Sequence, residues 1–213
     1  MISLLNALLV MVLLLNLFLL GTSRIRALIQ TAGLQGIVLG IMPMLTHGGW
    51  DLLTSIVAVA TILVKGWLIP QILFKALRDA QIKREVEPMI GFMPSMLLGA
   101  LGTVAAIAMA AKLPMAPGHL QTLIVPAALS TMFTGFLLLT SRIKAITQTI
   151  GYLVLENGIF IFGLLLLEAV PFLVELGVLL DLFVGIFVIS IIIHHINREF
   201  ASLDTRRLSA LKE

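Results

Sequence analysis

Long runs of apolar residues, separated by short polar segments, fill most of the chain. These runs cover approximately residues 2–21, 27–46, 52–74, 89–111, 120–140, 146–167 and 172–195. A helix that crosses roughly 30 Å of hydrocarbon needs about 20 residues at a rise of 1.5 Å each, and each run has about that length. The pattern therefore predicts an all-α, polytopic membrane protein with seven transmembrane helices.

The overall composition supports this interpretation. Hydrophobic residues make up 60% of the chain and charged residues 12%, which leaves too few polar side chains to cover a soluble globule. The first run has no basic segment before it and no small-residue cleavage site after it. We therefore expect it to remain in the mature protein as a membrane helix.

Basic residues are concentrated in alternate connections between the apolar runs. They are Arg24 and Arg26; Lys75, Arg78, Lys83 and Arg84; Arg142 and Lys144; and Arg198, Arg206, Arg207 and Lys212. By the positive-inside rule these connections lie in the cytoplasm, which predicts an amino terminus outside and a cytoplasmic carboxyl terminus. The net charge of +3 is thus explained by membrane topology, and we expect no nucleic-acid partner.

An internal repeat divides the chain. The segment Thr22–Gly33 (TSRIRALIQTAG) recurs as Thr140–Gly151 (TSRIKAITQTIG), with 8 of 12 positions identical. Each copy connects a first apolar run to a second, so the runs form two parallel three-helix units joined by one extra helix. The predicted division is a first unit at 1–75, a cytoplasmic loop and linker helix at 76–119, a second unit at 120–197 and a cytoplasmic tail at 198–213.

The second helices of the two copies differ in whether they carry a carboxyl group. Glu156 of the second copy corresponds to Val38 of the first. The first copy instead has Gly36 and Gly40 at helical four-residue spacing, a ridge of small residues on which another helix backbone can pack closely.

Three ionisable side chains lie near the middle of apolar runs: Lys65, Glu156 and Asp181. At that depth each costs about 2.5 to 3.5 kcal/mol, so such residues are interpreted as functional. They predict a proton pathway at the membrane midplane, with Glu156 and Asp181 as reversible proton carriers and Lys65 as their basic partner. Pro70 lacks a backbone N–H and is expected to kink its helix and to admit water beside Lys65.

Other polar residues are weaker candidates for the same pathway. Glu175, near the outer end of its run, is a candidate exit group, and His194 and His195, at the cytoplasmic end, are candidate uptake groups. Asn157 is a further candidate, with hydrogen bonding to a neighbouring helix as the simpler alternative.

The absence of cysteine limits the chemistry of the chain. With none present, the chain holds no disulfide, no thiolate-bound iron–sulfur cluster and no cysteine nucleophile. The histidines lie at the ends of apolar runs and lack the spacing of metal ligands, so we expect neither a metal nor a catalytic site within this chain.

Several segments resemble a known family. The runs GYLVLENGIF (Gly151–Phe160) and FLVELGVLLD (Phe172–Asp181), with VKGWLIP around Lys65, KLPMAPG and the tail RRLSALK, are similar to the component E family of hydrogenase-4 and formate hydrogenlyase complexes. The second unit also resembles the K subunit of complex I and the C subunit of multisubunit sodium/proton antiporters. Glu156 falls on the first glutamate of those subunits, and Asp181 with Gly185 falls on the second, with Asp in place of Glu.

The resemblance implies a non-redox subunit in the membrane arm of a group 4 [NiFe]-hydrogenase complex. It further implies antiporter-like and hydrogenase-module membrane subunits as partners, nickel–iron and iron–sulfur centres within those partners, and a place in the cytoplasmic (inner) membrane of a prokaryote. A subunit of a sodium/proton antiporter and a structural spacer stay open as alternatives. The residues also leave open whether Lys65 pairs within this chain or with a partner subunit.

Overall fold

The structure, a computed structural model, describes residues 2–46, 52–79, 86, 88–113 and 122–165. Its helices are α1 (Ile2–Gly21), α2 (Ile25–Thr46), α3 (Leu52–Thr61), the π-helix η1 (Ile62–Leu68), α4 (Ile69–Asp79), α5 (Phe92–Ala110), α6 (Ile124–Ser141) and α7 (Ala145–Gly163). Helices suit these apolar sequences because a backbone in lipid must satisfy its polar groups within the segment.

Six stretches of helix in the described part are long and apolar enough to cross a membrane. Helices α3, η1 and α4 follow one another without a break and supply one of the six, Ala58–Arg78. These six correspond to the first six predicted runs, and the seventh, 172–195, lies outside the described residues. The all-α, multi-pass class is therefore confirmed, whereas the seventh crossing and the orientation in the membrane stay predictions.

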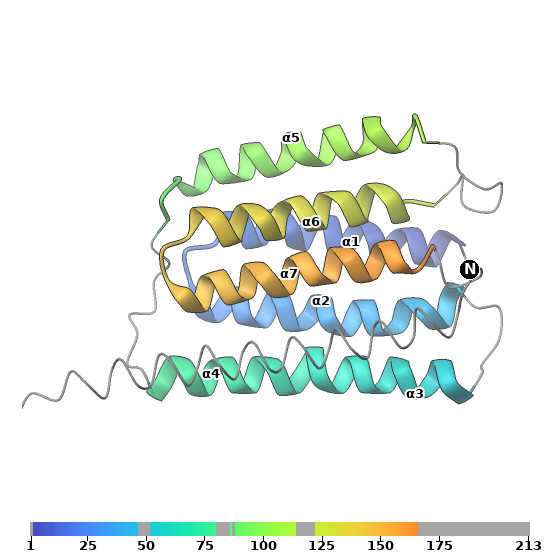
Figure 1. The fold of residues 1–213 in the computed structure, drawn as a ribbon, viewed down its shortest axis with the longest axis horizontal. Helices are drawn as coiled ribbons and strands as arrows, with labels where there is room; N and C mark the ends of the chain where they lie inside the picture. Colours follow the sequence, from blue (N-terminus) through green and yellow to red (C-terminus); the bar gives the residue numbers. More distant parts are fainter. Residues whose placement is uncertain (1, 47–51, 80–85, 87, 114–121, 166–213) are drawn as a thin grey trace, which may run out of the picture.

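The helices lie side by side with roughly aligned axes (Figure 1). Helix α5 forms one edge of the bundle, the continuous α3, η1 and α4 form the opposite edge, and α1, α2, α6 and α7 lie between them. Helices α2, α6 and α7 are the most buried of the six candidate spans and α5 is the least buried. The interior is therefore built around the two hairpins α1–α2 and α6–α7.

The buried interior has two apolar clusters, one toward each end of the bundle. One includes Leu19, Leu28 and Ile150 and lies at the end that carries both TSRI turns, and the other includes Leu9 and Phe160. Buried polar side chains occupy the sequence positions between the two clusters. Among them are Asn16 on α1, Gln35 on α2, Lys65 on η1, Thr131 on α6, and Glu156 and Asn157 on α7. These six residues are called the polar layer below.

Both copies of the repeated TSRI motif lie at the turn of a helical hairpin, yet their arginines differ. Arg24 is exposed, whereas Arg142 is 1% exposed. Arg142 donates hydrogen bonds to the carbonyl oxygens of Leu20, at 2.9 Å, and Ile90, at 3.1 Å, and its guanidinium lies 5.2 Å from the ring centroid of Phe92. Burial lowers the pKa of Arg142 below its usual value. The residue that indicated topology in the sequence thus also joins α1, α5 and α6.

Candidate functional site

A buried ion pair connects two of the charged residues singled out in the sequence. Nζ of Lys65, on η1, lies 2.6 Å from Oε1 of Glu156, on α7, and the two side chains are 5% and 2% exposed. Lys65 therefore pairs within this chain. At 2.6 Å the two atoms are in direct contact as an ion pair, with no other atom between them.

The backbone around Lys65 is a π-helix, in which the N–H of Ile69 donates to the carbonyl oxygen of Val64, five residues earlier. Pro70, the next residue, has no N–H with which to return the chain to the α-helical pattern at that point. A π-helical turn holds an extra residue and changes the direction in which the following side chains leave the helix axis. Such turns are frequent at functional sites.

Gly36 permits η1 to approach α2 closely. A Cβ atom at Gly36 would lie 2.6 Å from Cβ of Lys65 and 2.9 Å from its carbonyl carbon, which is closer than real Cβ atoms approach. One turn further along α2, a Cβ at Gly40 would lie 3.2 Å from the carbonyl oxygen of Ala58 on α3. The absence of side chains at these two positions therefore lets the backbone that carries Lys65 lie against α2.

Two further contacts surround the ammonium of Lys65. It donates a hydrogen bond of 3.3 Å to Oδ1 of Asn157, and it lies 5.6 Å from the ring centroid of Phe160. Glu156, Asn157 and Phe160 all belong to α7, so one helix supplies an anion, an amide oxygen and an aromatic face to the same cation. An aromatic face attracts a cation more strongly where water is excluded.

Hydrogen bonds extend from Asn157 across the polar layer. Its Nδ2 donates to Oε1 of Gln35 at 3.4 Å, Nε2 of Gln35 donates to Oδ1 of Asn16 at 2.8 Å, and Nδ2 of Asn16 donates to Oγ1 of Thr131 at 2.8 Å. The series Asn157, Gln35 and Asn16 is called the amide chain below. Together with Lys65 and Thr131 it joins η1, α7, α2, α1 and α6.

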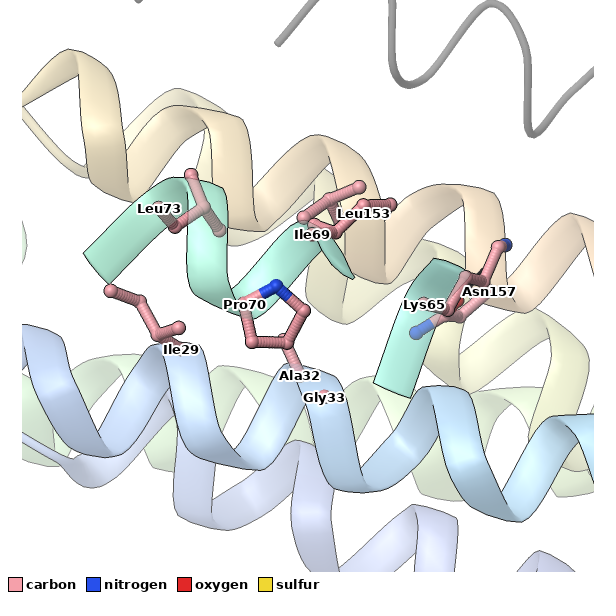
Figure 2. Close-up of a pocket in the computed structure, with 9 residues that line it drawn as sticks. All are labelled: Ile29, Ala32, Gly33, Lys65, Ile69, Pro70, Leu73, Leu153 and Asn157. Carbon is pink, nitrogen blue, oxygen red and sulfur yellow. Dashed lines mark hydrogen bonds between the residues drawn. The ribbon is translucent and has the colours of Figure 1, made fainter. Parts of the chain in front are cut away.

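A small cavity lies beside Lys65. Figure 2 shows Lys65 and Asn157 at one end of it, Leu73 and Ile29 at the other, and the ring of Pro70 between them. The cavity offers about 10 Å³ of space for water centres, roughly what one water molecule requires. The cavity thus lies against both Pro70 and Lys65, while the entry of water there stays a prediction.

The structure brings together only part of the predicted site. Lys65, Glu156 and Asn157 meet, and Gly36 lies against Lys65. The other candidates, Asp181, Glu175, Gly185, His194 and His195, lie outside the described residues. Within the described ranges no group of three His, Asp or Glu residues gathers in a way that could hold a metal ion.

Sequence reasoning missed Asn16, Gln35 and Thr131. The signal was present, because Gln35 and Asn16 carry primary amides within otherwise apolar runs, where a polar side chain needs a partner. An amide carries no charge, however, and the pattern alone does not identify its partner on another helix.

Comparison with known proteins identifies relatives of the chain. It is 33% identical over 154 residues to the hydrogenase-4 component E of Escherichia coli K12, which covers 70% of this chain and 69% of that protein. It is 29% identical over 192 residues to the uncharacterized protein Rv0085 of Mycobacterium tuberculosis, covering 89% of this chain and 87% of that protein. No family model and no solved structure matches. The chain is thus a multi-pass membrane protein that belongs to the hydrogenase-4 component E family.

Proposed function

We propose that this chain is a non-redox subunit in the membrane arm of a group 4 [NiFe]-hydrogenase complex, and that Lys65 and Glu156 form one station of its proton pathway. The name of the related hydrogenase-4 component supports the assignment to such a complex. Antiporter-like and hydrogenase-module membrane subunits are the proposed partners, and the redox centres belong to them. The single observation that carries the proton role is the buried contact of 2.6 Å between Nζ and Oε1.

The pair has two arrangements of equal total charge. In one the ammonium faces the carboxylate, and in the other the proton has moved to Oε1, leaving an amine and a carboxylic acid. Because an isolated charge is costly at this depth, both arrangements are favoured over any in which a single charge is buried without a partner. Proton transfer within the pair therefore requires no unpaired charge.

A further proton changes this balance. Its arrival protonates the carboxylate while Lys65 is still an ammonium, which leaves one buried positive charge without its partner. That state is unfavourable and is relieved when either group passes a proton onward. The pair thus transfers a proton and does not store one. Asp181, near the middle of its predicted run, is the proposed next carrier, with Glu175 as an exit group and His194 and His195 as uptake groups.

The cavity beside Pro70 supplies the proposed access to the pair. A water molecule there would lie next to Lys65 and Asn157, which both line the cavity. The remaining lining is largely apolar, so the polar end of the cavity is the end at which the proton is exchanged. The cavity extends from Lys65 toward the TSRI turns, which the predicted orientation places in the cytoplasm. The proposed proton access to the pair is therefore from the cytoplasmic side.

The decisive experiment replaces the pair singly and together within the assembled complex. Removing one partner of a buried ion pair costs about 3 to 5 kcal/mol, whereas replacing both by apolar residues is often neutral. We therefore expect Lys65→Met to reduce assembly, and Lys65→Met with Glu156→Leu to restore it. Proton uptake by inverted membrane vesicles, measured alongside hydrogen production, should be lost in the double variant while the hydrogenase reaction persists.

The same variants separate the alternatives. If the double variant takes up protons as fast as the parent protein, the proposed proton pathway through Lys65 and Glu156 is wrong. The two residues would then have only a packing role. Measurements with and without sodium ions distinguish the sodium/proton antiporter alternative, since only that alternative predicts that ion movement follows the sodium concentration. Glu156→Gln, which keeps the size of the side chain, serves as the variant of least structural change.

A further inference from the structure

The amide chain has a single donor direction. From Lys65 to Thr131, each of the four hydrogen bonds is donated by the residue nearer to Lys65 and accepted by the next. Asn157, Gln35 and Asn16 are each at most 2% exposed. Gln35 and Asn16 do not line the cavity beside Lys65, so water there does not supply them with alternative partners. Reversing either of these amides alone would bring two donors or two acceptors together at both of its ends.

The protonated amine of Lys65 determines this direction. An ammonium has three donors and no acceptor, so Asn157 must present its oxygen to Lys65 and its amino group to the next residue. The same requirement then passes to Gln35 and to Asn16. A neutral amine keeps two donors and gains one lone pair that accepts. While the proton stays on Oε1 of Glu156, that lone pair faces the carboxylic acid; once the proton has left the pair altogether, Asn157 can donate to the lone pair and the whole series can be reversed.

The far end of the chain accommodates both directions. Thr131 carries a hydroxyl group, which accepts a hydrogen bond from Asn16 in the structure and can equally donate one. A primary amide has no proton that it releases near neutral pH, so the series is not a continuation of the proton pathway. The series instead transmits the orientation of its amide groups from one residue to the next.

We infer that Asn157, Gln35 and Asn16 are positioning residues for Lys65, whose common hydrogen-bond direction reverses when the proton of Lys65 leaves the Lys65–Glu156 pair altogether, so that the charge state at η1 is registered at Thr131 on α6. The inference deepens the proposed function and rests on one part of it, the change of protonation at Lys65. It adds that the uncharged residues of the polar layer respond to the charged pair.

The charged groups near Lys65 are few within the described helices that surround it. Glu156 faces it from α7 and is the one charged residue of that helix, and α3 contains none. Arg26 lies ten residues before Gly36 on α2, and Lys75, Arg78 and Asp79 lie ten or more residues beyond Lys65 on α4. The response of the amide chain is therefore attributed to Lys65 and its partner Glu156.

Infrared difference spectroscopy on the full chain in lipid vesicles tests the inference. Glutamine carrying ¹³C at the side-chain carbonyl labels Gln35, and the difference from Gln35→Leu identifies its band. Nitrogen NMR with ¹⁵Nζ-labelled lysine, assigned by the loss of a signal in Lys65→Arg, follows the protonation of Lys65. The expected result is a shift of the Gln35 carbonyl band with alkaline pH that has the same midpoint as the Lys65 signal.

Three variants make the result specific. In Lys65→Arg the band shift is expected to vanish, because a guanidinium stays charged. In Asn157→Leu it is also expected to vanish, because the series is interrupted between Lys65 and Gln35. In Ser130→Ala it is expected to persist, because Ser130 bonds to Thr103 of α5, at 2.7 Å, and takes no part in the series.

A Gln35 band that does not follow Lys65 would overturn the inference, as would a shift that persists in Asn157→Leu. Either result leaves the proposed function intact, since proton uptake depends on the ion pair alone. Conversely, unchanged proton uptake in the double variant of Lys65 and Glu156 would remove the proton pathway without abolishing the spectroscopic response. The two hypotheses therefore fail separately.

Discussion

Gly36 of α2 lies directly against the backbone of Lys65 on η1, so closely that an added Cβ would lie 2.9 Å from the carbonyl carbon of Lys65. The helix that carries the buried cation is thus held by a position where no side chain fits. The close packing at Gly36 therefore also determines where the charge of Lys65 lies. The consequence is that the position of Lys65 can be changed without altering any charged residue.

Gly36→Ala is expected to displace η1 from α2 and to lower the stability of the protein by about 1 to 3 kcal/mol, the usual cost of overpacking. Proton uptake should fall as well, because Lys65 no longer lies at 2.6 Å from Glu156. Thermal unfolding in detergent gives the first quantity and inverted vesicles the second. Gly91→Ala is the control, since a Cβ there would lie 3.5 Å from the nearest atom, an ordinary contact. Equal behaviour of the two variants would contradict the prediction.

Pro70→Ala restores a backbone N–H directly after η1. We expect the π-helical turn to convert partly to α-helix, which rotates Lys65 away from Glu156 and lowers proton uptake in an assembled complex. Pro94→Ala is the matched control, because Pro94 lies in the first turn of α5, where a helix has no use for that N–H. The prediction is wrong if both proline variants take up protons equally well.

Arg142→Leu is expected to destabilise the bundle by about 3 kcal/mol or more, because it removes the guanidinium donors from the Leu20 and Ile90 carbonyls. Arg24→Leu, at the equivalent position of the repeat, should change stability by less than about 0.5 kcal/mol, because Arg24 is exposed. Melting temperatures of the two variants in the same detergent check this. A loss of equal size in both would show that the buried contacts of Arg142 contribute little.

The pH dependence of this effect follows from the direction of the shift. Burial lowers the pKa of Arg142, so the charged form is less favoured in the folded protein than in the unfolded chain. Charging therefore lowers folding stability at every pH below the folded pKa, and the loss is recovered only as the pH rises through it. Because arginine stays protonated in proteins, the stability difference between parent and Arg142→Leu should be constant across the neutral range.

Asn16→Leu removes the last member of the amide chain, with its hydrogen bonds to Gln35 and Thr131. We expect a loss of about 1 to 2 kcal/mol, toward the upper end of what hydrogen bonds between membrane helices contribute. Thr140→Val is the control, because that hydroxyl bonds to the carbonyl oxygen of Phe136 within its own helix. Thermal unfolding compares them, and an unaffected Asn16→Leu would mean that the chain adds little stability.

Much of the helical framework could be predicted from the sequence, because apolar length alone determines where a chain can cross lipid. The first predicted run, 2–21, coincides with α1 (Ile2–Gly21), and the other five runs in the described part agree with helices to within a few residues. The energetic cost of buried charge likewise singled out Lys65 and Glu156. Both inferences rest on properties of single segments.

The relationships between segments could not be predicted in this way. Lys65 and Glu156 meet because η1 lies beside α7, and nothing in either run identifies that neighbour. Arg142 has the same sequence context as Arg24, yet only one of them is buried, since burial depends on where α1 and α5 end. The π-helical turn at Lys65 has a partial signal in Pro70, but a proline alone indicates a kink and not its geometry.

The ion pair also spans the boundary between the two halves of the repeat. Lys65 belongs to the helices that follow the first TSRI turn, and Glu156 to the helix that follows the second. Expressed separately, the first half would carry Lys65 into the bilayer without Glu156, and the second half would carry Glu156 without Lys65. The two halves therefore depend on each other, since each supplies the opposite charge that the buried side chain of the other half requires.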